Sequence, residues 1–154
     1  MPLAEFNFGT LKYPWDDPRL ADFQDNLARV NALAQRSPGF IWMMPEDEMD
    51  RAQTDLLGPL AQRPNTASTL SVWTDAASLC HFVDQTLHSR FLARGAEWFA
   101  QGDRSHLVVW EIPPGARPSV AEGFAQWEAL MTEGETETRF GGRTLRQRAE
   151  AVQD

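Results

Sequence analysis

The chain of 154 residues is long enough for one domain with a hydrophobic core of its own. Its hydrophobic fraction of 42%, with six Trp and nine Phe, excludes an intrinsically disordered protein. The formal net charge of −8 disfavours partners that carry phosphate, so we expect neither nucleic-acid binding nor adhesion to an anionic membrane.

The single cysteine, Cys80, excludes an internal disulfide framework and is expected to be a small buried hydrophobic residue. The first residues lack the basic start and apolar run of a signal peptide. No stretch approaches the roughly 18 apolar residues that a membrane-spanning helix needs. These features together predict a cytoplasmic protein with no membrane partner.

The first predicted element is a strand over Leu3 to Leu11, because apolar and polar side chains alternate there. Phe6 and Phe8 point to one face, and Glu5 and Asn7 point to the other. A lone amide such as Asn7 in mid-strand needs a hydrogen-bond partner if it is buried, which can be a substrate or another side chain.

A helix is predicted next, with Asp17 as its cap and Pro18 in its first turn. Its apolar stripe is formed by residues spaced three or four apart, namely Leu20, Phe23, Leu27, Val30 and Ala34. Phe40 to Met44 is a short second strand. Residues 45–68 are predicted to be a long acidic loop inserted in the domain, with one short helix near Met49 to Leu57.

The second half of the domain repeats the alternation of strand and helix. A third strand is predicted over Thr69 to Trp73 and a helix from Asp75 to about Phe99. A fourth strand follows over His106 to Ile112, and the pair Ser119 and Glu122 forms a capping box that opens a third helix. We expect a single domain over residues 1–140 and a polar, Arg-rich tail over residues 141–154.

The predicted order is β-α-β-β-α-β with an added C-terminal helix, which is an α+β, ferredoxin-like arrangement. Its antiparallel sheet carries helices on one face. Strands that are apolar on both faces, such as Phe40 to Met44, predict that a second sheet covers the other face. A homodimer that pairs sheet against sheet would supply this cover.

Three stretches of the chain resemble the family known as domain of unknown function 3291. They are residues 3–42, 70–99 and 106–134, and they contain an S-V-W run, His88 followed by E-W-F at 97–99, and P-x-G-x-R-P near Arg117. The chain departs from the family at Ala116, where members often carry His, and in its longer acidic loop. The resemblance implies a dimeric α/β barrel, in a superfamily that holds cofactor-free monooxygenases, haem-degrading enzymes and plain ligand-binding proteins.

His88 is the first candidate catalytic residue, since a neutral imidazole can act as a general base near pH 7. Asn7 is the second, as the group that orients a substrate. The substrate pocket is expected to be formed by aromatic walls and one carboxylate, namely Trp73, Trp98, Trp110 and Glu111. Ordinary core packing of the aromatic residues remains the alternative.

No metal site is predicted, although His81, Asp84 and His88 share one helical face. A solvated polar face explains the same spacing. The resemblance also implies a haem alternative with His88 as the iron ligand, but Phe82 stands where a Trp is expected in haem-degrading relatives. We therefore expect no cofactor, with haem as a minor alternative.

The sequence leaves three functions open. The first is a homodimer that binds a small aromatic or polycyclic molecule, and oxidises it as a cofactor-independent monooxygenase does or rearranges it as a cyclase or isomerase does. The second is a non-catalytic binding or scaffold protein, whose partner surfaces are the acidic loop and the Arg-rich tail. The third is a haem protein that uses His88.

Overall fold

The computed structural model describes residues 1–55, 57–61, 65–87, 98–100 and 106–153. The strands are β1 (Leu3–Thr10), β2 (Phe40–Met43), β3 (Thr66–Trp73), β4 (His106–Glu111) and β5 (Arg139–Phe140). The helices are the 3-10 turn η1 (Pro18–Leu20), α1 (Ala21–Arg36), α2 (Glu46–Thr54), α3 (Ala76–Leu87), α6 (Val120–Glu133) and α7 (Gly142–Gln153). None of these helices is long and apolar enough to cross a bilayer.

The described strands form one antiparallel sheet in the order β2-β3-β1-β4-β5. The long strands β1 and β3 pair over their whole length, from Leu3 opposite Trp73 to Thr10 opposite Thr66. This confirms the α+β, ferredoxin-like arrangement predicted from the order of elements. The alternation in β1 is also confirmed, because Phe6 and Phe8 lie on one face of the sheet while Glu5 and Asn7 lie on the other.

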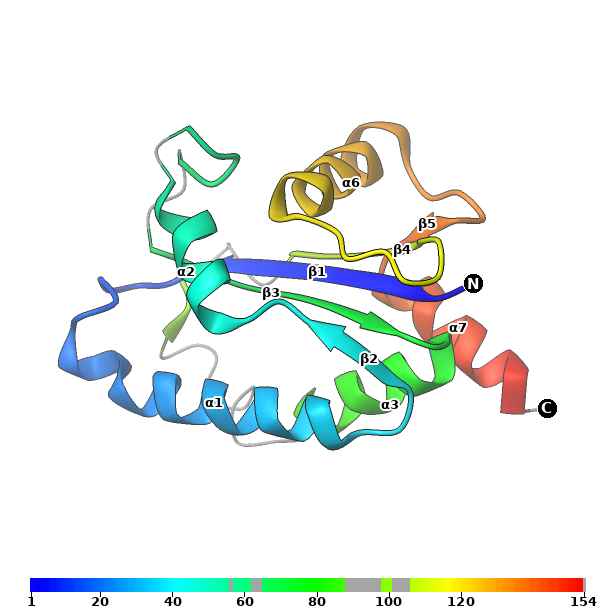
Figure 1. Ribbon diagram of the computed structural model, residues 1–154, viewed down its shortest axis with the longest axis horizontal. Helices are drawn as coiled ribbons and strands as arrows, with labels where there is room; N and C mark the ends of the chain where they lie inside the picture. Colours follow the sequence, from blue (N-terminus) through cyan, green and yellow to red (C-terminus); the bar gives the residue numbers. More distant parts are fainter. Residues whose placement is uncertain (56, 62–64, 88–97, 101–105, 154) are drawn as a thin grey trace.

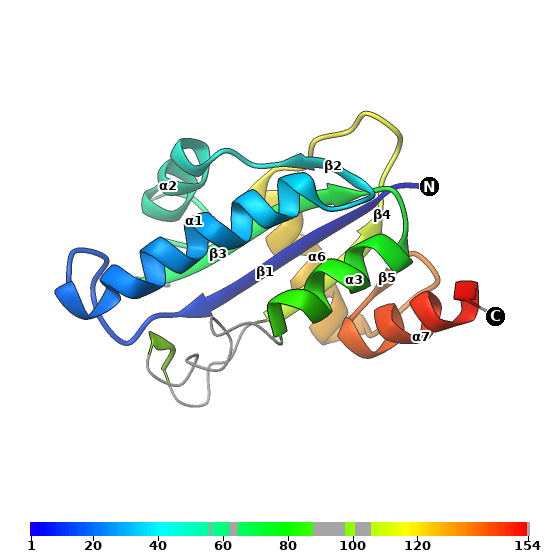
Figure 2. The ribbon, with the colours of Figure 1, turned by 90° about the horizontal axis from the view of Figure 1, so that it is seen from below.

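Helices of this chain lie on both faces of the sheet (Figure 1). On the face seen in Figure 2, α1 and α3 lie over the sheet, α1 running nearly along β1, and α7 packs beside α3. On the opposite face, Val120 and Leu130 of α6 pack on β1 and β4, and Met49 of α2 joins the same cluster. The chain's own α6 thus covers β1 and β4 on this face, while Ile41 of β2, in the strand whose apolar residues predict a second sheet, is exposed.

The close approach of α6 to β1 depends on Gly123. A Cβ atom at this position would lie 2.8 Å from Cγ of Phe6, closer than packed carbon atoms can come. Trp127, one turn further along, meets Phe8 edge to face with 5.0 Å between ring centroids. Aromatic rings of the strand and the helix therefore interlock across an interface that has room for only a hydrogen atom at residue 123.

Two segments contain more regular structure than their composition suggests. Within residues 45–68, α2 begins at Glu46, earlier than the helix expected from Met49, and β3 begins at Thr66 rather than Thr69. The Arg-rich segment 141–154 contains α7, whose Leu145 and Ala149 are buried in the same cluster as Leu79 of α3. In both segments a few apolar side chains among many charged ones are enough to pack a helix against the core.

Candidate functional site

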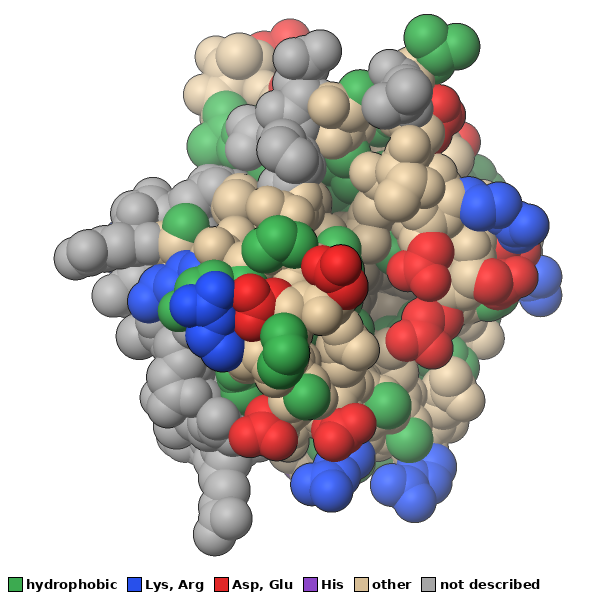
Figure 3. Space-filling view, turned by 90° about the vertical axis from the view of Figure 1, so that its left-hand side faces the viewer, with side chains coloured by type: hydrophobic (Ala, Val, Ile, Leu, Met, Phe, Trp, Pro, Cys, Tyr) green, Lys and Arg blue, Asp and Glu red, His purple; other side chains and the backbone are tan. Residues whose placement is uncertain are grey.

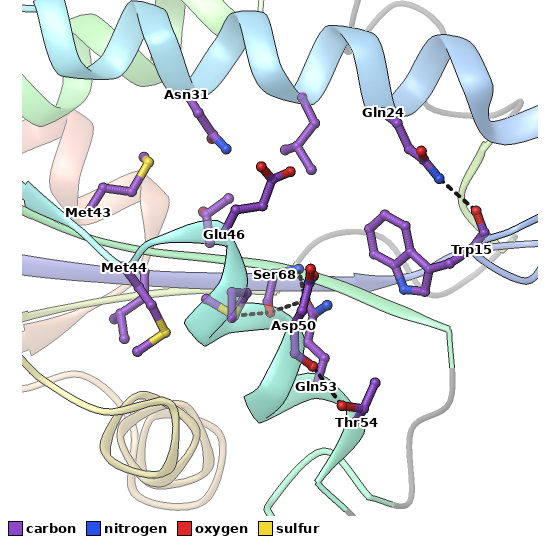
Figure 4. Close-up of a pocket in the computed structure, with 14 residues that line it drawn as sticks. Trp15, Gln24, Asn31, Met43, Met44, Glu46, Asp50, Gln53, Thr54 and Ser68 are labelled. Carbon is purple, nitrogen blue, oxygen red and sulfur yellow. Dashed lines mark hydrogen bonds between the residues drawn. The ribbon is translucent and has the colours of Figure 1, made fainter.

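A cavity of about 370 Å³ lies at the edge of the sheet, between α1 and α2. The last residue of β2 is Met43, and beyond it the described residues give β3 no strand neighbour on this side. Loop residue Trp15, α1 and α2 enclose the space that is left (Figure 4). The apolar part of its wall consists of Trp15, Leu27, Met43, Met44, Met49 and Leu70.

The polar part of the wall carries negative charge and hydrogen-bonding groups. Two carboxylates, Glu46 and Asp50, extend from α2, and the described wall contains no Lys, Arg or His. The uncharged polar residues of the wall are Gln24, Asn31, Gln53, Thr54, Ser68 and Thr69. Acidic side chains gather on both sides of a hollow on this face of the molecule (Figure 3). Such a wall favours a guest that has an apolar body and a cationic or hydrogen-bond-donating group.

Gln53 of α2 takes the place of a neighbouring strand along part of β3. Its Oε1 accepts hydrogen bonds from the backbone N–H of Ser68, at 3.0 Å, and from the Ser68 hydroxyl, at 2.7 Å. The hydroxyl of Ser68 also lies 3.0 Å from the sulfur of Met49. An unpaired backbone N–H at a strand edge needs an acceptor, so these contacts hold α2 against the sheet and fix one wall of the cavity.

Asn31 lines the cavity and carries an unsatisfied acceptor. Its Oδ1 is buried and accepts no hydrogen bond from any described residue. The side chain extends from α1 toward Glu46, which extends from α2 on the other side of the cavity (Figure 4). A buried amide oxygen without a donor costs free energy, and a donor on a bound molecule would recover it.

A buried polar cluster adjoins the cavity through Thr69. The hydroxyl of Thr69 donates to Oε1 of Glu5 at 2.9 Å, and its oxygen accepts from Nδ2 of Asn7 at 2.7 Å. Asn7 also donates to the Glu5 carboxylate, at 2.9 and 3.1 Å. On the far side of Glu5, Ser71 bonds the carboxylate and accepts from Nε1 of Trp73 at 2.9 Å.

Burial raises the pKa of Glu5 from 4.5 to about 7, although hydrogen bonds from Thr69, Asn7 and Ser71 act in the opposite direction. The side chain is only 3% exposed, so removal of water from the carboxylate dominates. A carboxyl group with a pKa near neutrality can take up and release protons under physiological conditions, which is the property of a general acid or base.

The structure places the predicted site residues apart. Asn7 lies in the Glu5 cluster, and Trp73 borders that cluster while stacking on Phe82. Trp98 packs with Phe23 near the start of α1. Trp110 lies on the opposite face of the sheet, in the cluster under α6, and Glu111 follows it at the end of β4. None of these lines the cavity described here, and His88 is outside the described residues.

The residues weighed as metal ligands have other contacts. Asp84 forms an ion pair with Arg146 of α7 at 3.2 Å, and a ring nitrogen of His81 lies 2.8 Å from the amide nitrogen of Gln85. Within the described part of the chain, no three His, Cys, Asp or Glu side chains come together as a metal would require. The haem alternative depends on His88 and stays a prediction.

Several site residues escaped the sequence analysis, chief among them Glu5, Asn31 and Thr69. A signal existed for two of them. Glu5 shares with Asn7 the strand face that helices cover, and Asn31 occupies the position between Leu27 and Ala34 in the apolar stripe of the first helix. A polar residue at a position where the periodicity calls for an apolar one is a mark of a buried polar site.

Solved structures resemble this chain in fold. A protein of unknown function from Nitrosomonas europaea, NE2512, is 17% identical, with 77% of this chain and 95% of that chain covered and a TM-score of 0.51. SnoaB, a cofactor-independent oxygenase from Streptomyces nogalater, is 19% identical, with 79% of this chain and 98% of that chain covered and a TM-score of 0.40. The structure of a SnoaB mutant is 18% identical, with 77% of this chain and 98% of that chain covered and a TM-score of 0.42.

No curated protein matches the chain. The family model described as "Domain of unknown function (DUF3291)" matches residues 2–153. Because that match spans almost all of the 154 residues, the chain belongs to the DUF3291 family.

Proposed function

We propose that this protein binds a small organic molecule in the cavity between α1 and α2. The observation that carries the proposal is the cavity itself, whose wall includes Asn31, a residue with a buried Oδ1 that has no donor among the described residues. The volume of about 370 Å³ suits a molecule of one or two fused rings. Trp15 and the methionines Met43 and Met44 supply the apolar contacts, and methionine adapts readily to different guests.

The test is a fragment screen by protein-detected NMR, using naphthalene derivatives that carry an amine, an alcohol, a ketone or a carboxylate. Binding should shift the indole signal of Trp15 and the side-chain amide signals of Asn31 and Gln24. Asn31→Leu should weaken the binding of the best fragment at least tenfold. Asn26→Leu is the matched control, because Asn26 lies on the same helix and donates to the backbone carbonyl of Asp22 instead. A screen in which no fragment shifts these signals would contradict the proposal.

The second candidate function is catalysis on the bound molecule without a cofactor, either oxidation by O₂ or a rearrangement. It is favoured by the near-neutral pKa of Glu5, which hydrogen-bonds to the cavity residue Thr69. His88 and Asn7 stay predicted as catalytic base and orienting group. Oxygen consumption and product formation with hydroxylated polycyclic aromatics would test this candidate, and a fully active His88→Ala variant would remove His88 from it.

The homodimer and the haem alternative can be tested together by native mass spectrometry of the purified protein. A mass of two chains supports the dimer, and an added mass would identify haem or an organic guest. The scaffold alternative assigns the acidic segment to a partner protein. Here α2 of that segment forms a wall of the cavity through Glu46, Met49 and Gln53, which connects the segment to the proposed ligand site.

A further inference from the structure

Thr69 lines the cavity, and its hydroxyl donates a hydrogen bond to Glu5. Among the described residues, this is the only direct hydrogen bond between a cavity-lining residue and Glu5. Thr69 faces Asn7 in the register of β1 and β3, and Glu5 is two residues away on the same strand face. This placement makes the hydrogen-bonding state of one cavity group depend on a carboxyl group behind it.

A hydroxyl has one hydrogen to donate and two lone pairs that accept. One lone pair of Thr69 accepts from Asn7 Nδ2 at 2.7 Å whatever the state of Glu5. When Glu5 is ionised, the Thr69 hydrogen must go to the carboxylate, 2.9 Å away, and the hydroxyl offers the cavity only a lone pair. When Glu5 is protonated on Oε1, the carboxylic acid donates to Thr69 instead, and the Thr69 hydrogen is free to turn to the cavity.

We infer that ionisation of Glu5, transmitted through Thr69, selects which ligands the cavity takes. With Glu5 ionised, the cavity takes ligands whose polar group donates hydrogen bonds, such as an alkylammonium or amidinium group on an apolar body. With Glu5 protonated, it takes ligands that accept, such as ketones. This inference rests on the proposed function, since it concerns the same cavity.

The rest of the wall agrees with a donating, cationic ligand in the ionised state. Asn31 Oδ1 is an acceptor that lacks a donor among the described residues. The carboxylates of Glu46 and Asp50 add negative charge at the α2 side, and the described wall holds no cation that would compete. An ammonium group has three hydrogens, enough to serve the amide oxygen, the hydroxyl and a carboxylate at once.

Few titratable groups surround Glu5 in the described residues. β4 opposes it with Val109 and β3 opposes it with Ser71, neither of which is charged. On α3 the buried thiol of Cys80 belongs to the same cluster as Val109, and burial raises the pKa of that thiol. On α1 the cavity-lining polar residues are the neutral amides Gln24 and Asn31. Among the groups named here, Glu5 is therefore the one whose charge can change near neutral pH, and its hydrogen bond with Thr69 connects that change to the cavity.

Ligand binding should consequently be linked to a proton. A ligand that needs ionised Glu5 binds in proportion to the ionised fraction, and a pKa of about 7 leaves about one molecule in thirty ionised at pH 5.5. The affinity for a donating ligand should then rise about thirtyfold between pH 5.5 and pH 8.5, and binding near pH 6 should release close to one proton. The affinity for an accepting ligand should change in the opposite direction.

The experiment is isothermal titration calorimetry with 2-naphthylmethylamine as the donating probe and 2-acetylnaphthalene as the accepting probe, from pH 5.5 to 8.5. Repeating each titration in two buffers with different ionisation enthalpies gives the number of protons released. Glu5→Gln should abolish the pH dependence for both probes. Glu46→Gln is the matched control, since it removes a wall carboxylate that does not contact Thr69 and should weaken amine binding while keeping the slope.

The outcomes separate the two proposals. Amine binding that rises with pH in the wild type, releases a proton, and loses both properties in Glu5→Gln supports the inference. Binding of either probe with pH-independent affinity and no proton release overturns it and leaves the proposed function standing. Failure of both probes, with no fragment binding to the cavity, overturns the proposed function as well. The wild-type proton count decides the matter even if Glu5→Gln does not fold.

Discussion

The Thr69 hydroxyl lies between Glu5 and the cavity, with its oxygen 2.9 Å from Oε1 of Glu5 and 2.7 Å from Nδ2 of Asn7. A buried carboxyl group, 3% exposed, thus has a hydrogen-bonded path to a wall that a ligand can touch. Burial makes the charged form of Glu5 costly, and the cluster compensates only in part, which leaves a titration near neutral pH inside the fold.

Glu5 should make the protein less stable as the pH rises. Its pKa is about 7 in the folded chain, above the value of 4.5 that applies when it is solvated, so the folded state holds the extra proton between these values. The free energy of unfolding should therefore fall by roughly 3 kcal/mol between pH 4.5 and pH 7 from this group alone.

Urea unfolding of the wild type and of Glu5→Gln at pH 5, 6, 7 and 8 measures this effect. The variant should show a flatter profile and should exceed the wild type in stability at pH 8. Glu46→Gln, at an exposed position, should reproduce the wild-type slope. Parallel profiles for the wild type and Glu5→Gln would show that Glu5 titrates outside this pH range.

Asn31→Leu should stabilise the free protein while weakening ligand binding. The substitution removes a buried acceptor that has no donor in the described structure, and adds apolar surface next to Leu27. We expect a gain on the order of 1 kcal/mol in the free energy of unfolding. Thermal unfolding with and without the best fragment measures both effects, and a variant that loses stability would mean that the Asn31 amide has a structural partner.

The sequence predicted the sheet well because apolar and polar residues alternate along β1 and apolar residues recur every three or four positions in the helices. Phe6 and Phe8 alternate with Glu5 and Asn7, and the capping role of Asp17 is confirmed by its bond to the N–H of Arg19. The strand β5 was missed, since two residues, Arg139 and Phe140, in a polar run give no period to detect.

The candidate site was predicted less well, because the sequence shows which residue types are present and not which elements adjoin. The prediction favoured tryptophans, yet Trp73 and Trp110 lie on opposite faces of the sheet and fill its two cores. The cavity depends on β2 ending at Met43 and on α2 folding against the exposed edge of β3. Composition alone describes that acidic segment as a loop.

Gln53 should be needed to hold α2 on the edge of β3. Its Oε1 accepts from both the backbone N–H and the hydroxyl of Ser68, so Gln53→Ala would leave the N–H without its acceptor and the hydroxyl with only the weakly accepting sulfur of Met49. We expect a loss of about 1–2 kcal/mol and faster hydrogen exchange of the Ser68 amide, together with weaker binding of any cavity ligand.

Gln53→Glu is the conservative comparison, because a carboxylate also accepts both bonds. This variant should retain the slow exchange of the Ser68 amide. Equal protection of that amide in the wild type and in Gln53→Ala would show that the edge of β3 is held by other contacts, such as the bond from Met44 N to the Leu70 carbonyl.

Gly123→Ala should destabilise the protein even though alanine favours helices. Replacing glycine by alanine within a helix stabilises the helix by about 1 kcal/mol. The reverse change Ala125→Gly, at an exposed position of α6, would measure the size of this effect in the same helix. The added Cβ would lie 2.8 Å from Cγ of Phe6, whose ring is fully buried and 5.5 Å from that of Phe8. Overpacking of this kind costs about 1–3 kcal/mol, so the net effect should be a loss.

A double-mutant cycle with Phe6→Leu would isolate the contact. If the clash of the new Cβ with the Phe6 ring causes the loss, Phe6→Leu should cost less stability in the Gly123→Ala background than in the wild type. Additive losses would place the strain elsewhere on α6. Phe6 faces Leu70 of the cavity wall across the β1–β3 pair, so the readout of this cycle is stability and not ligand binding.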